Sequence, residues 1–130
     1  MAEKSLVILR GLPGSGKSSL ASLLSKAICS ADDYLINREG EYIWTESRVI
    51  QAHEWCKRKC ERFMKKQISL VVIDNVSVKS KDMRPYRKLA KEYGYKVYSV
   101  IVENRHKGIN THNVSKEIMK SMRKKFEICL

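Results

Sequence analysis

Eight residues near the amino terminus, GLPGSGKS from Gly11 to Ser18, have the types and spacing of a loop that cradles phosphate groups. Glycine permits the backbone angles that turn successive N–H groups toward one point, and a helix starting after the loop adds its positive dipole end. Lys17 would reach the β- and γ-phosphates, and the Ser18 hydroxyl would bind Mg²⁺. The residues expected to hold the nucleotide are Gly11, Pro13, Gly14, Ser15, Gly16, Lys17, Ser18 and Ser19.

Acidic residues follow two later segments of the chain. Asp74 comes directly after the apolar run LVVI, at the end of an expected strand. In a parallel sheet this end lies beside the phosphate loop, so Asp74 is expected to hold Mg²⁺ through water. Asp32 and Asp33 place two adjacent carboxylates in a basic chain, which favours a position near a metal or a reacting hydroxyl. A solvent-exposed turn pair is the alternative interpretation.

The elements that must position these residues alternate between strands and helices. Apolar runs predict strands over Ser5–Arg10, Ser69–Asn75 and Tyr95–Glu103, and a short return through the sheet near Ala27–Tyr34. Helices are expected over about Lys17–Ala27, Thr45–Gln67, Lys81–Gly94 and Ser115–Glu127. This alternation predicts one α/β domain over residues 1–130, with three layers and a parallel sheet.

Helical spacing also predicts which faces point inward. In the first helix the expected apolar face is Leu20, Leu23, Leu24 and Ala27. In the second helix the expected inward stripe is Val49, His53, Cys56, Cys60 and Phe63, with Thr45 as the N-cap. Three of these side chains are metal-ligating types, but no fourth zinc ligand is evident, and core packing explains the same spacing.

The composition is that of a single basic domain, with 130 residues and a net charge of +12. The charge is uneven, because residues 1–56 have a net charge of −1 and residues 57–130 a net charge of +13. Such a field favours polyanions, although solvated lysine-rich helix faces would explain it equally well. No apolar run is long enough to cross a membrane, and a cytoplasmic, intracellular protein with reduced cysteines is expected. The oligomeric state is left open.

Six segments, in this order, resemble the polynucleotide 5′-hydroxyl kinase branch of the P-loop kinases. They are LRGLPGSGKSS, SADDYL, AHEWC, VVIDNVS, MRPY and NVSKEIMKSMRKKFE. The resemblance implies a P-loop NTPase fold with four or five parallel strands, ATP and Mg²⁺ as cofactors, and a 5′-hydroxyl of RNA or DNA as the acceptor. It also implies that Asp32 is the general base, that Lys17 and Ser18 contact phosphate and metal, and that Asp74 and Asn75 form the acidic pair at the strand end.

The chain departs from the pattern of this branch at three places. Leu35 stands where the branch has an arginine that grips the acceptor phosphate, and Asn75-Val76-Ser77 replaces its Asp-Thr-Asn-like motif. The lid arginine has no clear equivalent, and Arg105 is the candidate to neutralise the transferring phosphoryl group. The candidate residues for binding the acceptor are Asp33, Asn75, Ser77 and Arg84.

These features together predict an ATP-dependent phosphotransferase that acts on nucleic-acid 5′ ends. Lys17, Asp32 and Arg105 would be its catalytic residues. Two alternatives stay open. One is a kinase for a nucleoside, a nucleotide or a sugar, and the other is a catalytically weak ATP-binding module in nucleic-acid repair, which the leucine at position 35 motivates.

Overall fold

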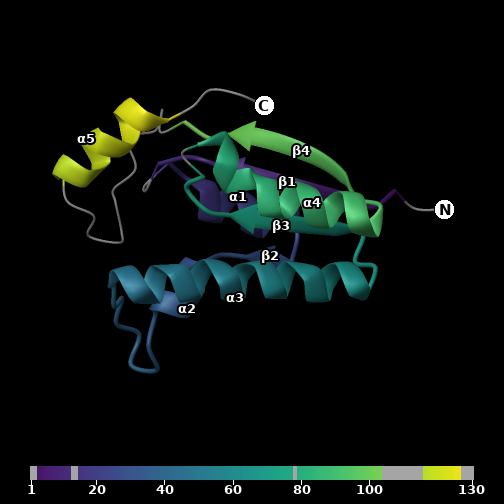
Figure 1. The fold of residues 1–130 in the computed structure, drawn as a ribbon, viewed down its shortest axis with the longest axis horizontal. Coiled ribbons are helices and arrows are strands. Elements are labelled where there is room, and N and C mark those ends of the chain that lie inside the picture. The colour runs from purple at the N-terminus through teal and green to yellow at the C-terminus, as the bar shows by residue number, and fades with distance from the viewer. Residues whose placement is uncertain (1–2, 13–14, 78, 104–115, 127–130) are drawn as a thin grey trace.

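The computed structural model describes residues 3–12, 15–77, 79–103 and 116–126 (Figure 1). In this part of the chain, parallel strands form one sheet in the order β2-β3-β1-β4, with bounds β1 Ser5–Arg10, β2 Ile28–Cys29, β3 Leu70–Asp74 and β4 Lys96–Ile101. β1 lies in the middle, with Leu6 opposite Val71 of β3 and Val97 of β4. The predicted α/β fold with a parallel sheet is therefore confirmed, and of the four or five strands expected the described residues form four.

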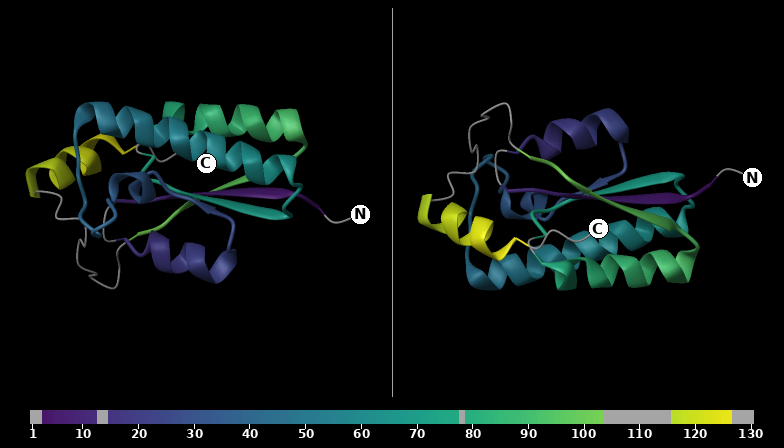
Figure 2. Two further views of the ribbon diagram at one scale, coloured as in Figure 1. Left: turned by 90° about the horizontal axis from the view of Figure 1, so that it is seen from below. Right: turned by 90° about the horizontal axis from the view of Figure 1, so that it is seen from above.

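Helices cover both faces of the sheet, which makes three layers (Figure 2). Helix α1 lies on one face, and α3 and α4 lie side by side on the other. Helix α5 lies beyond the end of the sheet at which β1 finishes. The helix bounds are α1 Lys17–Leu24, α2 Asp32–Leu35, α3 Glu46–Lys65, η1 Ser80–Met83, α4 Arg84–Tyr93 and α5 Lys116–Lys125.

Alternation along the two central strands explains why both faces need a cover. Leu6 and Ile8 of β1 pack toward α3 and α4, where they join a large apolar cluster. Leu9 points to the other face, where it packs with Ala21 of α1 and Val72 of β3. A parallel strand that is buried on both faces reads as a continuous apolar run, and in β1 this run is Leu6–Leu9.

Helix α3 begins and packs largely as its spacing predicts. The Thr45 hydroxyl caps it by accepting a hydrogen bond from the Arg48 backbone N–H at 3.1 Å. Cys56 and Cys60 are fully buried thiols, and Val49 and Phe63 pack against the core. The prediction for His53 was wrong, because this side chain is exposed and Ala52 and Met64 face inward in addition. The described residues contain no group of three metal-ligating side chains that could hold zinc.

The inward face predicted for α1 was partly wrong. Leu23 is 84% exposed and Leu24 is 40% exposed, whereas Ala21 is fully buried. The helix ends at Leu24, so Ala27 lies beyond it. The small Ala21 side chain lets the helix approach the sheet closely, and Leu20 supports it from one side.

Helix α4 has the expected signals at both ends. Pro85 lies in its first turn, where the missing N–H has no intrahelical partner to lose. Gly94 ends the helix in the left-handed conformation with φ 75°, which glycine adopts without strain. No helix in the described part of the chain is long and apolar enough to span a bilayer.

Candidate phosphate-binding and acceptor site

The phosphate loop lies where β1 ends and α1 begins, at the centre of one edge of the sheet. Gly16 has φ 99°, a left-handed angle that lets the chain turn directly into α1 at Lys17. Gly11 is needed for space, because a Cβ there would lie 2.6 Å from Ser15 Oγ and 2.7 Å from the Val102 carbonyl oxygen. The backbone thus presents the amino end of α1 to a bound anion. The remaining two loop positions, Pro13 and Gly14, lie outside the described residues.

Lys17, Ser18 and Asp74 meet at this edge, although 56 residues separate Ser18 from Asp74. The Ser18 hydroxyl donates a hydrogen bond to Asp74 Oδ2 at 3.1 Å. Lys17 is only 9% exposed, and burial lowers the pKa of its ammonium group. The negative charges of Asp74 and Asp32 oppose this shift and raise the pKa of Lys17. The two carboxylates, which have different predicted roles, therefore both stabilise the charge of the same lysine.

Asp74 has an environment that suits a nearby cation. Burial raises the pKa of this carboxyl group, and the charges of Asp32 and Asp33 raise it further, while Lys17 and the Ser18 hydroxyl act in the opposite direction. A divalent cation would favour the ionised carboxylate that burial disfavours. Mg²⁺ binds through one or two protein oxygens together with water and substrate phosphates. Ser18 and Asp74 therefore fit Mg²⁺ bound together with a nucleotide.

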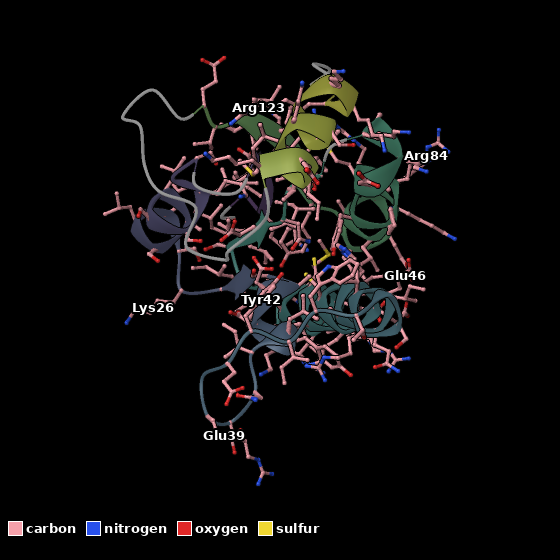
Figure 3. The ribbon with its side chains drawn as sticks, turned by 90° about the vertical axis from the view of Figure 1, so that its left-hand side faces the viewer. Lys26, Glu39, Tyr42, Glu46, Arg84 and Arg123 are labelled. Atoms are coloured by element: carbon pink, nitrogen blue, oxygen red, sulfur yellow. The ribbon has the colours of Figure 1, made fainter. Side chains whose placement is uncertain are left out.

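Asp32 opens the short helix α2 and receives a hydrogen bond that the sequence did not indicate. The Tyr42 hydroxyl donates to Asp32 Oδ1 at 3.1 Å. Burial and the negative charge of Asp32 raise the pKa of this hydroxyl, so it remains a donor at neutral pH. In Figure 3, which looks onto the edge of the sheet where α5 lies, Tyr42 lies near the middle of the molecule.

Tyr42 reaches Asp32 because residues 36–42 form a small hairpin. Ile36 and Tyr42 pair as an isolated antiparallel bridge, and Gly40 has φ 82° in the turn between them. The side-chain oxygen of Asn37 accepts two backbone hydrogen bonds across this turn, at 2.8 and 3.0 Å. The turn-forming residues Asn37 and Gly40, between the apolar residues Ile36 and Tyr42, were the available signal for a hairpin.

Asn75 links the end of β3 to the start of α2. Its side-chain oxygen accepts a hydrogen bond from the Ala31 backbone N–H at 2.9 Å, next to Asp32. Its amide nitrogen points inward, 3.5 Å from the Tyr86 hydroxyl and 3.6 Å from Cys56 Sγ. Asn75 therefore helps to place the backbone that presents Asp32.

Arg10 is a second residue whose position the sequence did not indicate. It is the last residue of β1 and is fully buried. Its Nε donates to the Ser77 carbonyl oxygen at 2.9 Å, and its guanidinium lies 4.9 Å from the centre of the Phe126 ring. Ser77 has φ 49°, so this contact holds a residue in the left-handed region. Arg10 connects β1, the loop after β3 and the end of α5.

A pocket of about 650 Å³ opens beside Asp32, between α2, α3, the end of β3 and the start of α4. We call it the α2–α3 pocket. Its wall includes three of the predicted site residues, Asp32, Asn75 and Ser77. Leu35 also lines it and is only 3% exposed, so an apolar wall replaces the arginine that the resemblance implies. Its other lining residues include Tyr42, Trp44, Val49, Ile50, Ala52, His53, Glu54, Lys57, Lys81, Asp82, Pro85, Tyr86 and Met122.

The structure brings most, but not all, of the predicted site together. Arg84 is exposed at the start of α4 and does not line the pocket, although its neighbour Pro85 does (Figure 3). Asp33 is exposed on α2 and acts on Asp74 through its charge. Ser19 is exposed in the first turn of α1. Arg105 lies outside the described residues.

The sequence matches known proteins over most of its length. A family model described as an AAA domain matches residues 6–127. Human NEDD4-binding protein 2 is 43% identical over 98 residues, which are 71% of this chain but 5% of that protein. The chain thus spans about one twentieth of the length of this curated relative.

Solved structures share the fold at low sequence identity. A gluconokinase from Sinorhizobium meliloti has a TM-score of 0.57 and 17% identity, covering 98% of this chain and 77% of that chain. The APS kinase of Mycobacterium tuberculosis, in complex with AMPPNP and APS, has a TM-score of 0.55 and 17% identity, covering 78% of this chain and 63% of that chain. These similarities show a P-loop kinase-like fold.

Proposed function

The chain belongs to the AAA-domain family, and from this membership and its P-loop kinase-like fold we propose that it is an ATP-dependent polynucleotide 5′-hydroxyl kinase. It would transfer the γ-phosphoryl group of ATP to a 5′-hydroxyl of RNA or DNA. One observation supports this proposal above the others. The phosphate loop with Lys17, Ser18 and Asp74 adjoins a pocket whose wall contains a carboxylate, Asp32, and the charge of Asp32 reaches Lys17.

On the donor side, the loop amides and the amino end of α1 would hold the β- and γ-phosphates of ATP. Lys17 would contact the same phosphates, and Ser18 with Asp74 would hold Mg²⁺, Asp74 through water. When bound, Mg²⁺ would supply positive charge beside the transferring phosphoryl group. Arg105 is proposed to neutralise charge that develops on this group in the transition state.

On the acceptor side, Asp32 would accept the proton of the hydroxyl as its oxygen forms a bond to the γ-phosphorus. The bond from this phosphorus to the bridging oxygen breaks, and ADP keeps that oxygen. The Tyr42 hydroxyl and the Asn75 contact to Ala31 hold Asp32 in place before the acceptor arrives. Asp33, Asn75, Ser77 and Arg84 are proposed to contact the acceptor.

The nucleic-acid acceptor is proposed from the size and lining of the pocket, the net charge of +13 over residues 57–130 and the resemblance of the motifs. Apolar side chains dominate the wall of the α2–α3 pocket. Such a wall suits the flat face of a nucleobase better than a sugar with hydroxyl groups on every side.

The test is transfer of label from γ-labelled ATP in the presence of Mg²⁺. The acceptors would be a 5′-hydroxyl RNA oligonucleotide, the same sequence in DNA, nucleosides, gluconate and no acceptor. Transfer to an oligonucleotide is expected, and it should fall at least about a hundredfold in Asp32→Asn, which keeps the shape but loses the base. Glu39→Gln is the matched control, because Glu39 points away from the body of the molecule at the hairpin tip (Figure 3).

Other outcomes would point elsewhere. Label that appears only on nucleosides or gluconate would reject the polynucleotide acceptor. ATP binding without transfer to any acceptor, with the same affinity in Asp32→Asn, would favour the ATP-binding module. The replacement of the arginine by Leu35 would then mark the loss of the acceptor site.

A further inference from the structure

The mouth of the α2–α3 pocket has exposed apolar side chains that the phosphate chemistry does not use. Trp44 is 58% exposed and Ile50 is 72% exposed, yet both line the pocket. They lie on either side of the Thr45 cap, where the chain enters α3. A large aromatic side chain that is exposed beside a pocket presents the flat face of its ring to a ligand.

Basic side chains lie in the wall of this pocket and on the helix that reaches it. Lys57 and Lys81 line the pocket itself. Helix α5 reaches it through Met122, and all five basic residues of α5 are exposed: Lys116, Lys120, Arg123, Lys124 and Lys125. The same helix contains one acidic residue, Glu117. Figure 3 shows α5, with Arg123 labelled, on the same side of the molecule as Tyr42.

The acidic residues of the pocket wall, Asp32, Glu54 and Asp82, offset only part of this charge, because with Glu117 they are four carboxylates against the seven cations of the wall and α5. Asp82 accepts a hydrogen bond from the Lys79 backbone N–H at 2.9 Å, at the start of η1. Glu54 lies 3.8 Å from the Arg58 guanidinium, one turn along α3. Asp32 is the proposed base. The exposed tryptophan therefore shares this pocket with two lysines and with Met122 of the basic helix α5.

We propose that the mouth of the α2–α3 pocket binds single-stranded nucleic acid, with the base of the second nucleotide stacked on Trp44 and the phosphates facing α5. Exposed aromatic faces next to positive charge are the two features that single-strand sites combine. An apolar protein segment would match Trp44 and Ile50 but not the five cations of α5. A duplex end would keep its bases paired and would not offer them to the indole ring.

This surface rests on the proposed function, because the 5′-hydroxyl at Asp32 sets the direction of the strand. The first nucleotide occupies the pocket, and the strand leaves it over Trp44. An acceptor with one nucleotide therefore does not reach the indole ring, whereas an acceptor with two or more does. If Trp44 binds the second nucleotide, the effect of replacing it depends on the length of the acceptor. A residue that only shapes the pocket would affect acceptors of every length.

The experiment uses Trp44→Ala with three acceptors that have a 5′-hydroxyl: a nucleoside 3′-phosphate, a dinucleotide and a hexamer. Base stacking on an aromatic residue predicts a KM for the dinucleotide and the hexamer that rises about 5- to 100-fold. The KM for ATP and the KM for the nucleoside 3′-phosphate should stay within about twofold of the parent values. Trp44→Phe should recover most of the loss, because it keeps an aromatic face. Leu23→Ala is the matched control, since Leu23 is 84% exposed on α1 and does not line the pocket.

Direct binding is measured in parallel, without ATP, by the fluorescence anisotropy of a 3′-labelled hexamer at several salt concentrations. Weaker binding in Trp44→Ala, together with affinity that falls steeply with salt, would support the surface. Equal affinity in Trp44→Ala and the parent protein would overturn it, and so would equal losses for the nucleoside 3′-phosphate and the hexamer.

The two proposals fail in different ways. Binding through Trp44 without phosphoryl transfer would reject the kinase activity and keep the surface. Transfer to the hexamer that is unaffected by Trp44→Ala would reject the surface and keep the kinase.

Discussion

Replacing Tyr42 with phenylalanine removes one hydroxyl group from the hairpin of residues 36–42 and leaves the ring in place. The hydroxyl donates to Asp32 Oδ1 at 3.1 Å and so links this hairpin to the proposed base. A hydrogen bond to an ionised carboxylate contributes about 1.5–3 kcal/mol. Tyr42 and Asp32 are both half-buried, so water competes, and we expect about 1–2 kcal/mol.

If this free energy holds Asp32 in its reactive position, kcat for transfer to the oligonucleotide should fall about 5- to 30-fold in Tyr42→Phe. The KM for ATP should not change, because the phosphate loop is a separate element. Burial and Asp32 raise the pKa of the Tyr42 hydroxyl, so it remains protonated from pH 6 to 9. The ratio of the parent rate to the variant rate should therefore be constant across this range.

The assay is single-turnover transfer with saturating ATP, accompanied by thermal unfolding of each variant. Tyr98→Phe is the matched control, because the Tyr98 hydroxyl donates to Glu3 at 3.2 Å on the exposed edge of the sheet. It loses the same oxygen and the same kind of partner, far from the pocket. Equal kcat in Tyr42→Phe and the parent protein would refute the positioning role, as would an equal loss in Tyr98→Phe.

Three further predictions follow from the buried groups at the phosphate edge. Asp74→Asn should weaken the apparent Mg²⁺ affinity in the transfer assay about 10- to 100-fold. Burial raises the pKa of Asp74 above its ordinary 3.8, so ionising this carboxyl group above that pH destabilises the folded parent protein. The asparagine of the variant has no group to ionise there. In urea unfolding, the free energy of unfolding of the variant should therefore rise relative to that of the parent as the pH rises from about 4 to 7. Gly11→Ala should destabilise the fold by about 1–3 kcal/mol, because its Cβ would meet a carbonyl oxygen at 2.7 Å, and it should weaken ATP binding, measured by calorimetry. Gly40→Ala is the control: it should destabilise the fold by about 1 kcal/mol and leave ATP binding unchanged. Arg10→Met should lower the free energy of unfolding by about 2–4 kcal/mol in urea titrations, since a carbonyl oxygen loses its buried donor and Phe126 loses its cation.

Local signals predicted the elements well where the signal and the structure depend on the same few residues. The run Ser5–Arg10 is a strand, Thr45 caps α3, and Gly94 ends α4, because each follows from backbone preferences over one or two turns of chain. The face of α1 was less predictable. Its apolar stripe is wider than the strip that reaches the sheet, so Leu23 points outward and the smaller Ala21 faces in.

The residues of the candidate site also differ in how far the sequence indicated them. The phosphate loop depends on glycines within eight residues, and the position of Asp74 beside it depends on its place at the end of an apolar strand, so both were available from the sequence. Tyr42 and Arg10 were not, because their partners are set by a hairpin turn and by the docking of distant segments. A tyrosine ten residues from an aspartate has no spacing that indicates a hydrogen bond.

The amino-acid sequence by itself determined the fold class, the phosphate loop and the acidic strand end, since these depend on periodicity and on short motifs. Only the tertiary structure decided how the proposed acceptor side is built. It placed Tyr42 on Asp32, Asn75 on the backbone before it, Leu35 in the pocket wall and Trp44 at the pocket mouth. The physical reason is that the residues of this pocket come from segments spread between Ala31 and Met122, and close packing, rather than local preference, brings their side chains together.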